Sequence, residues 1–103
     1  MDKAWKAFER RIARVFGGKR RGPRPGSDVI APGWSIECKL LSRPSYSAML
    51  EACRQAEGER ECPQDIPVGV IKRKGDRDSD ALVVMRLAVF SEYFIGGLDL
   101  SED

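Results

Sequence analysis

A ten-residue stretch rich in glycine and proline, residues 17–26 (GGKRRGPRPG), separates the first part of the chain from the rest. Glycine and proline disfavour both helix and strand, so we predict a mobile basic loop here, with independent elements on either side. Seven arginines and lysines and no acidic residue lie between positions 10 and 27, although the net charge of the whole chain is only +2. Positive charge is therefore concentrated around this loop.

The periodicity of apolar residues predicts the elements that flank the loop. We expect helices over residues 2–16, 46–57 and 87–94, and strands over residues 27–31, 34–41, 67–72 and 81–86. The order αββαββα indicates an α/β (α+β) fold, a mixed sheet flanked by helices. A chain of 103 residues has room for one core, so we predict a single domain over residues 1–103.

The composition excludes several classes of function. The chain has no histidine, which removes serine–histidine and cysteine–histidine catalysis and every zinc site that needs imidazole. Its three cysteines lack CxxC spacing, which is typical of free thiols in a reducing compartment. No stretch approaches the roughly 20 apolar residues that cross a bilayer. We therefore expect a cytoplasmic protein that has no membrane partner.

The predicted strand over residues 34–41 carries the most informative pair of side chains. Because side chains alternate along a strand, Glu37 and Lys39 point to the same face. Asp28 begins the preceding strand, close enough for its carboxylate to converge with that of Glu37. Two hard oxygen ligands and an ammonium group could then reach one metal ion and its water. The alternative is an ordinary solvent-facing Glu/Lys pair on a half-exposed strand.

Glu9 is unusual because it shares the apolar stripe of the first predicted helix. A carboxylate that faces a core is costly unless it meets a cation, a metal or hydrogen-bond donors. Glu9 therefore either joins the site of Asp28 and Glu37 or lies at the edge of the stripe and pairs with a nearby basic residue. The basic residues within reach on the same helix are Lys6, Arg11 and Arg14.

Glu9, Asp28 and the triplet Glu37-Cys38-Lys39 resemble the motif of the PD-(D/E)XK nuclease superfamily, and the chain is most similar to small phage and archaeal-type Holliday junction resolvases. The resemblance extends from the first helix to the strands VGVIKRK and ALVVMRL; Ser27 stands where the motif often has proline. It implies a restriction-endonuclease-like fold. It also implies a structure-selective endodeoxyribonuclease of DNA recombination and repair, encoded by a phage or acting in a prokaryotic cytoplasm.

The resemblance also implies roles for individual residues. Asp28, Glu37 and the backbone carbonyl of Cys38 would hold Mg²⁺ or Mn²⁺, and Lys39 would position the attacking water or stabilise the transition state. Glu9 would orient a water on the metal or help to bind a second ion. Gln55, in the helix after the motif, is a weaker candidate, because its spacing from the apolar stripe equally suits a surface residue.

The implied substrate is branched DNA, a four-way junction, and the implied assembly is a homodimer, because a resolvase nicks two strands symmetrically. Part of the apolar run over residues 83–95 is expected to bury against the second subunit. Lysine and arginine neutralise phosphates, so basic residues should contact the DNA backbone. The candidate nucleic-acid-binding residues are Lys19, Arg20, Arg21, Arg24, Ser27, Lys72 and Arg73.

Two other functions stay open at this point. One is a different nuclease of the same superfamily, such as a flap or restriction-like enzyme. The other is a non-catalytic nucleic-acid-binding module in which Glu37 and Lys39 form only a surface ion pair. Aromatic residues at helix or strand spacing usually belong to a core, and this spacing predicts core positions for Trp5, Phe8, Trp34 and Tyr46 in preference to base stacking.

Overall fold

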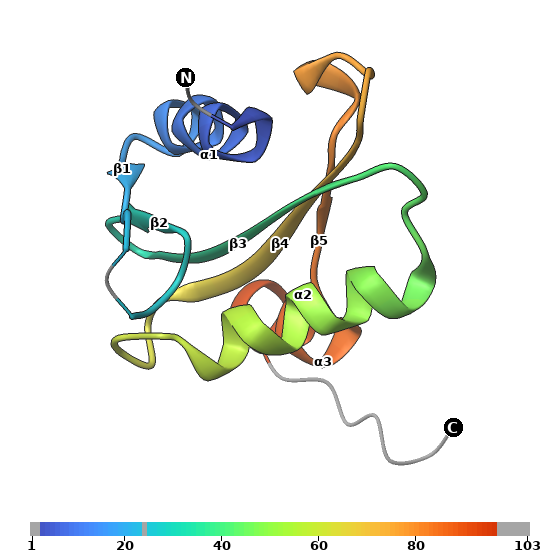
Figure 1. The fold of residues 1–103 in the computed structure, drawn as a ribbon. Helices are drawn as coiled ribbons and strands as arrows, with labels where there is room; N and C mark the ends of the chain where they lie inside the picture. Colours follow the sequence, from blue (N-terminus) through green and yellow to red (C-terminus); the bar gives the residue numbers. More distant parts are fainter. Residues whose placement is uncertain (1–2, 24, 97–103) are drawn as a thin grey trace.

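The computed structural model describes residues 3–23 and 25–96 (Figure 1). A helix leads into three strands, a second helix, two further strands with a 3-10 turn between them, and a short helix that continues into a π-helical turn. The bounds of the elements are α1 Ala4–Val15, β1 Lys19–Arg20, β2 Val29–Ala31, β3 Trp34–Leu41, α2 Tyr46–Gly58, β4 Ile66–Arg73, η1 Asp78–Asp80, β5 Leu82–Val84, α3 Leu87–Phe90 and η2 Ser91–Ile95.

The strands form one mixed sheet in the order β1-β2-β3-β4-β5. β3 and β4 are parallel, and the other neighbouring strands are antiparallel. Parallel strands need a connection that crosses the sheet, and α2 provides it. Figure 1 shows α1 against one face of the sheet, with α2 and α3 on the opposite side. The central strand β3 therefore lies between two helices.

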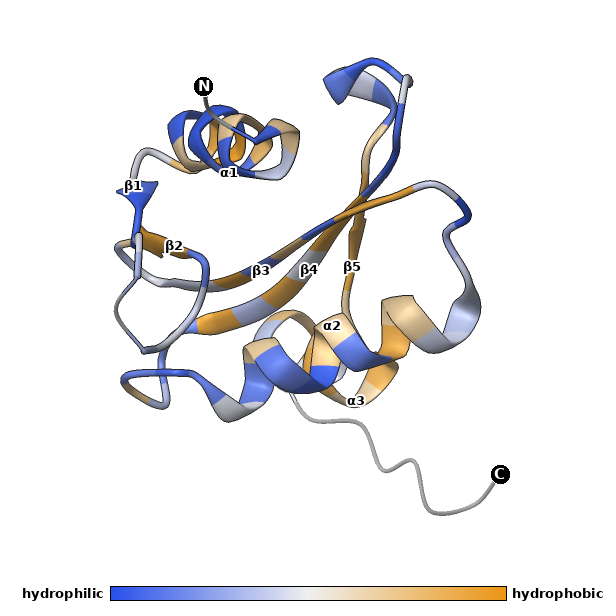
Figure 2. Cartoon of the chain, in the orientation of Figure 1, coloured by the Kyte–Doolittle hydropathy of each residue, from blue (hydrophilic) through white to orange (hydrophobic). Residues whose placement is uncertain are grey.

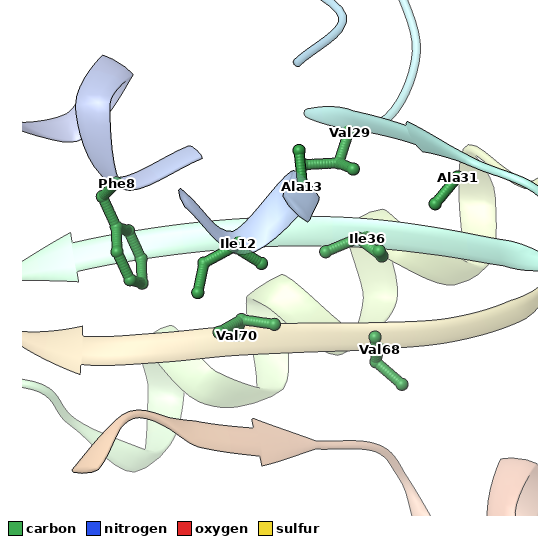
Figure 3. Close-up of a cluster of buried hydrophobic side chains, with 8 residues drawn as sticks. All are labelled: Phe8, Ile12, Ala13, Val29, Ala31, Ile36, Val68 and Val70. Carbon is green, nitrogen blue, oxygen red and sulfur yellow. The ribbon is translucent and has the colours of Figure 1, made fainter. Parts of the chain in front are cut away.

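The main core lies between α1 and the sheet (Figure 3). From α1 it receives three residues at helical spacing, and from β2, β3 and β4 it receives side chains that share one face of the sheet. Phe8 is completely buried, which stabilises the fold by roughly 1.5–3 kcal/mol. The core side chains are Phe8, Ile12, Ala13, Val29, Ala31, Ile36, Val68 and Val70.

On the opposite face, α2 lies close to the sheet because small residues form the contact. Gly69 of β4 is the register partner of Glu37 in β3. A Cβ added to Gly69 would lie 2.9 Å from the Cβ of Ala52 in α2, which leaves no room for a larger residue. Nearby, the hydroxyl of Ser35 donates a 2.6 Å hydrogen bond to the carbonyl of Ala56. The helix is therefore fixed at short range above β3.

The coarse fold expected from the sequence, a mixed sheet flanked by helices, is confirmed. Residues 34–41 form a strand with the predicted bounds. The second helix runs one residue further than predicted, to Gly58, and the Ser45 hydroxyl caps it by accepting a hydrogen bond from the backbone N–H of Ala48. Alternation along β3 and the capping serine were sufficient signals for these elements.

The prediction that residues 17–26 contain no strand is wrong, so the element order has one more strand than expected. Lys19 and Arg20 pair with β2 as a short edge strand. A Cβ at Gly18 would lie 2.1 Å from the carbonyl oxygen of Ile30, so the glycine permits this close approach. The same residue type that argued against regular structure is what allows the strand to lie there.

The last strand and the last α-helix are also shorter than the sequence predicts. The strand predicted over residues 81–86 is limited to β5, and the helix predicted over residues 87–94 changes to a π-helical turn at Ser91. β5 is an edge strand, and Figure 2 shows it as apolar below a hydrophilic β4–β5 tip. Within the described ranges, no helix is long and apolar enough to cross a membrane.

Candidate functional site

A pocket opens along β3 at the point where its neighbour ends. β2 pairs only with the first three residues of β3, so from Glu37 onward β3 has a sheet neighbour on the β4 side alone. A cavity of about 410 Å³ lies at this open edge, bordered by residues of both α1 and α2. Its charged and amide-bearing lining residues are Glu9, Asp28, Glu37, Lys39, Gln55 and Glu59. All four predicted catalytic side chains therefore line one pocket.

Asp28 extends the ladder between β2 and β3 with its side chain. Its backbone N–H donates to the carbonyl of Ile36 at 3.0 Å, and its Oδ2 accepts from the backbone N–H of Cys38 at 2.9 Å. The N–H and C=O of one strand residue point toward the same edge, so the carbonyl of Cys38 also faces the open edge. The sequence motif thus places a carboxylate and a backbone carbonyl side by side.

Glu37 is 5 % exposed and lies among other carboxyl groups. Burial raises the pKa of Glu37 to about 10, helped by a hydrogen bond with Glu59 and by the negative charge of Asp28. A solvent-facing Glu/Lys pair would show neither this burial nor this crowding by acids. The alternative of an ordinary surface pair on β3 is therefore contradicted for Glu37.

Two buried oxygens in this pocket lack a hydrogen-bond partner among the described residues. They are Oε1 of Gln55 and Oε2 of Glu59, which lie one helical turn apart at the end of α2. An unsatisfied buried acceptor costs about 1–3 kcal/mol. Both oxygens are therefore open to a donor or a cation from outside the described residues.

Sequence reasoning missed Glu59. The signal was present, because Glu59 follows Gln55 at the i+4 spacing that places two side chains on the same helical face. The same spacing suits a surface residue, so the sequence alone does not single out Gln55. Its buried amide oxygen and its place in the pocket wall raise its rank as a site residue.

Glu9 is buried, as its place in the apolar stripe predicted, at 7 % exposure. Its ion-pair partner is Arg20 of β1, whose Nε donates to Glu9 Oε1 at 2.7 Å, and of the helical candidates Lys6 adds a weaker attraction. Burial raises the pKa of Glu9, opposed by this hydrogen bond. The Arg20 guanidinium also stacks over the ring of Trp5, 5.4 Å from its centroid.

Lys39 lies on the same face of β3 as Glu37 and lines the same pocket. Within residues 3–23 and 25–96, no carboxylate oxygen lies within ion-pairing distance of Lys39, although acids surround its neighbour Glu37. Cys38, between them, packs its side chain toward the core on the other face. Burial raises the pKa of its thiol, so the sulfur stays protonated and only the backbone of Cys38 serves the pocket.

The donor set suits a hard divalent cation, because it consists of carboxylate, amide and carbonyl oxygens. No group of three or more Asp, Glu or Cys side chains in the described part of the chain is already arranged to hold a metal ion. Instead, the carboxyl group of Glu37 contacts those of Asp28 and Glu59. The unpartnered oxygens of Gln55 and Glu59 beside this cluster fit the need for a cation.

The candidate nucleic-acid-binding residues occupy different environments. Lys19 and Arg73 are exposed, the latter paired with Asp76. Arg21 bonds to the carbonyl of Ser27 and to Glu61. Arg24 lies outside the described residues.

Two further candidates are buried, which conflicts with direct contact to a phosphate. Ser27 is 3 % exposed, and its hydroxyl donates to the carbonyl of Val29. Lys72 pairs with Asp78 and lies over the ring of Phe8. Both side chains hold neighbouring segments together in this structure.

The aromatic residues also divide into two groups. Phe8 belongs to the core, and Trp34 packs edge-on against Phe16 with ring centroids 5.1 Å apart. The prediction that Trp5 and Tyr46 belong to the core is wrong, since 44 % and 76 % of their surfaces are exposed. Trp5 stands at the pocket wall, where its ring faces two cations, Arg20 and Lys6.

Comparison with known proteins returned no match: no family model, no curated protein and no solved structure is significantly similar to this chain.

Proposed function

We propose that this protein is a metal-dependent endodeoxyribonuclease with a restriction-endonuclease-like fold, acting on branched DNA such as a four-way junction. The observation that carries the proposal is the convergence of Glu9, Asp28, Glu37 and Lys39 on one pocket. These residues come from α1, from the turn before β2 and from β3, so their meeting is a property of the fold. The resemblance to the PD-(D/E)XK superfamily supports the same reading.

Asp28, Glu37 and the carbonyl of Cys38 would hold Mg²⁺ or Mn²⁺, with Gln55 and Glu59 as neighbouring oxygen donors. When bound, the ion would supply Lewis-acid activation of water and of the scissile phosphodiester. The hydrogen bond from Cys38 N–H fixes the Asp28 carboxylate at the strand edge. This contact orients one ligand before any ion arrives, which reduces the entropic cost of binding.

Lys39 would act on the substrate. Lys39 lines the pocket from the same strand face as Glu37, where its ammonium group would donate hydrogen bonds to a phosphate oxygen or to the attacking water. A cation fixed beside a phosphate stabilises the negative charge that develops in the transition state. The absence of a nearby carboxylate partner among the described residues leaves this group ready for that role.

Branched DNA as the substrate and a homodimer as the active form belong to the same proposal. Two antiparallel strands of a junction require two active sites related by a twofold axis. The edge strand β5 and the following helix expose apolar side chains that a second copy of the chain could cover. These side chains are Leu82, Val83, Leu87, Phe90, Phe94 and Ile95.

The test is cleavage of a synthetic four-way junction, a flap and a linear duplex, each assayed with Mg²⁺ and with EDTA. We expect nicking of the junction that requires Mg²⁺ and is abolished by Glu37→Gln and by Lys39→Ala. Glu51→Gln and Lys74→Ala remove the same charges from exposed positions and should cleave like the natural protein.

Each other outcome would overturn a defined part of the proposal. Faster cleavage of the flap or duplex would replace the junction with a different substrate of the same chemistry. Junction binding without nicking in Mg²⁺ or Mn²⁺ would indicate a non-catalytic nucleic-acid-binding module. Turnover that survives both Glu37→Gln and Lys39→Ala would show that the site is elsewhere.

A further inference from the structure

Arg20 and Glu9 each have a role in the proposed function, and the structure shows that the two side chains form an ion pair with each other. Arg20 was expected to bind a DNA phosphate and Glu9 to serve the metal. Instead they share a hydrogen bond of 2.7 Å at the wall of the pocket. While this ion pair is intact, Glu9 Oε1 and the Nε–H of Arg20 are engaged with each other.

The two partners differ in how firmly the fold holds them. Glu9 lies in the middle of α1 beside the fully buried Phe8, and 9 % of its side chain is exposed. Arg20 belongs to the two-residue edge strand β1, and 20 % of its side chain is exposed. Movement of the guanidinium therefore disturbs less of the structure than movement of the carboxylate.

Arg20 also has unused capacity toward a second anion. A guanidinium carries five N–H donors, and Glu9 engages the Nε–H. The Trp5 ring lies against the guanidinium plane and is itself 44 % exposed, so the group is at the surface edge of the pocket. Phosphate and guanidinium form paired, charge-assisted hydrogen bonds, which makes a DNA phosphate a strong competitor for this side chain.

We propose that Arg20 is a positioning residue that occupies the cation position of Glu9 in the free protein and leaves it for a DNA phosphate. This inference rests on the proposed function for its DNA step. Once Arg20 has moved, Glu9 is a buried carboxylate that has lost its ion-pair partner and keeps the weaker attraction of Lys6, which is costly. A divalent cation in the pocket would then compensate it, so DNA and metal each strengthen the binding of the other.

The first test measures Mn²⁺ binding by calorimetry in the absence of DNA. Arg20→Gln keeps a side chain that can lie on Trp5 but removes the charge, and Mn²⁺ should bind about tenfold more tightly than to the natural protein. Arg20→Lys should restore the weaker affinity. Lys19→Ala is the matched control, because it removes an exposed cation from the same strand without a contact to Glu9, and it should leave Mn²⁺ binding unchanged.

The second test measures the reverse coupling by fluorescence anisotropy of a labelled junction in EDTA, where no cleavage occurs. Glu9→Gln releases Arg20, so the junction should bind several-fold more tightly. Glu51→Gln removes an equal charge from an exposed site on α2 and should have a smaller effect. Thermal unfolding of each variant shows that the fold is retained.

The inference is overturned if Arg20→Gln and Lys19→Ala have the same Mn²⁺ affinity, or if Glu9→Gln binds the junction no better than Glu51→Gln. These results are separate from the fate of the proposed function. If the natural protein cleaves DNA but Arg20→Gln leaves the Mn²⁺ affinity unchanged, the proposed nuclease activity stands and the movement of Arg20 from Glu9 to a phosphate is rejected. Altered Mn²⁺ affinity in a protein that never cleaves DNA would leave the Arg20–Glu9 competition in place and reject the nuclease.

Discussion

The two faces of β3 differ in what they bury. The face toward α1 is apolar, with Ile36 completely buried in the main core. The face toward α2 buries Ser35 and Glu37 and ends in a pocket where two oxygens find no hydrogen-bond partner in the described part of the chain. Neighbouring residues of β3 therefore stabilise the core on one face and, in our proposal, bind the metal on the other. This is possible because successive side chains of a strand point to opposite faces.

We expect the largest effect from a substitution on the α2 face of β3, and we expect it on cleavage and not on stability. Glu37→Gln should reduce cleavage of a four-way junction below detection, because the pocket loses a carboxylate that our proposal assigns to the metal. The free energy of unfolding should stay equal or rise, since a neutral amide replaces a carboxyl group buried among acids. Cleavage assays and urea denaturation of the same preparation check both statements. Lost cleavage together with a large loss of stability would contradict the division between the faces.

The preceding residue should show the opposite pattern. Ile36→Ala removes a completely buried side chain from the core and should lower the free energy of unfolding by about 2–5 kcal/mol. Urea denaturation measures this loss. Val15→Ala, at an exposed position of α1, is the control and should change stability by less than about 0.5 kcal/mol. Equal effects at both positions would show that the α1 face is not the main core.

A smaller effect is expected at Ser35, which is on the α2 face but has a structural contact. Ser35→Ala leaves the carbonyl of Ala56 without its 2.6 Å hydrogen bond and should cost about 1–3 kcal/mol. Ser42→Ala, at an exposed bend, should be neutral. Thermal unfolding of both variants would sharpen the comparison, because a neutral Ser35→Ala would mean that α2 is held by packing alone.

The smallest effect concerns Asp78 of η1, which forms ion pairs with Arg11 of α1 and Lys72 of β4. Hydrogen bonds from Arg11 and Lys72 lower the pKa of Asp78 to about 2, from 3.8. A lowered pKa in the folded state contributes stability above the ordinary pKa, and this contribution is lost as the pH falls from about 4 to about 2. Since the pair is partly exposed, the effect should be under about 1 kcal/mol.

Urea denaturation between pH 2 and pH 6, with Asp78→Asn beside the natural protein, measures this contribution. The difference in unfolding free energy between the two proteins should shrink as the pH falls through that range. A difference that stays constant with pH would mean that the two cations do not stabilise the ionised carboxylate.

Much of the fold followed from local patterns. Alternation in residues 34–41 gave the strand and its two faces, and apolar spacing gave α1 and α2. β1 could not be predicted, because its existence depends on a close contact between Gly18 and a strand that lies 12 residues further along the chain. Such contacts between distant residues leave no periodic signal.

The site was predictable where one motif carried it. Asp28, Glu37 and Lys39 follow from acids and an amine placed on neighbouring strands. The i+4 spacing puts Glu59 on the same helical face as Gln55, but whether that face meets the site depends on how α2 crosses the sheet. The ion-pair partner of Glu9 could not be predicted for a similar reason, because helical spacing indicates only neighbours on α1 and Arg20 reaches Glu9 from the edge of the sheet.

Gly69 has a consequence for how this pocket can change during evolution. It lies next to Glu37 across the β3–β4 ladder and directly under Ala52, so two of the smallest residues set the height of α2 above the sheet. Added bulk at either position would tilt the helix outward and carry Gln55 and Glu59 with it. Substitutions at these two positions could thus change the depth of the pocket for a larger or smaller ligand while every acidic residue that lines it stays the same.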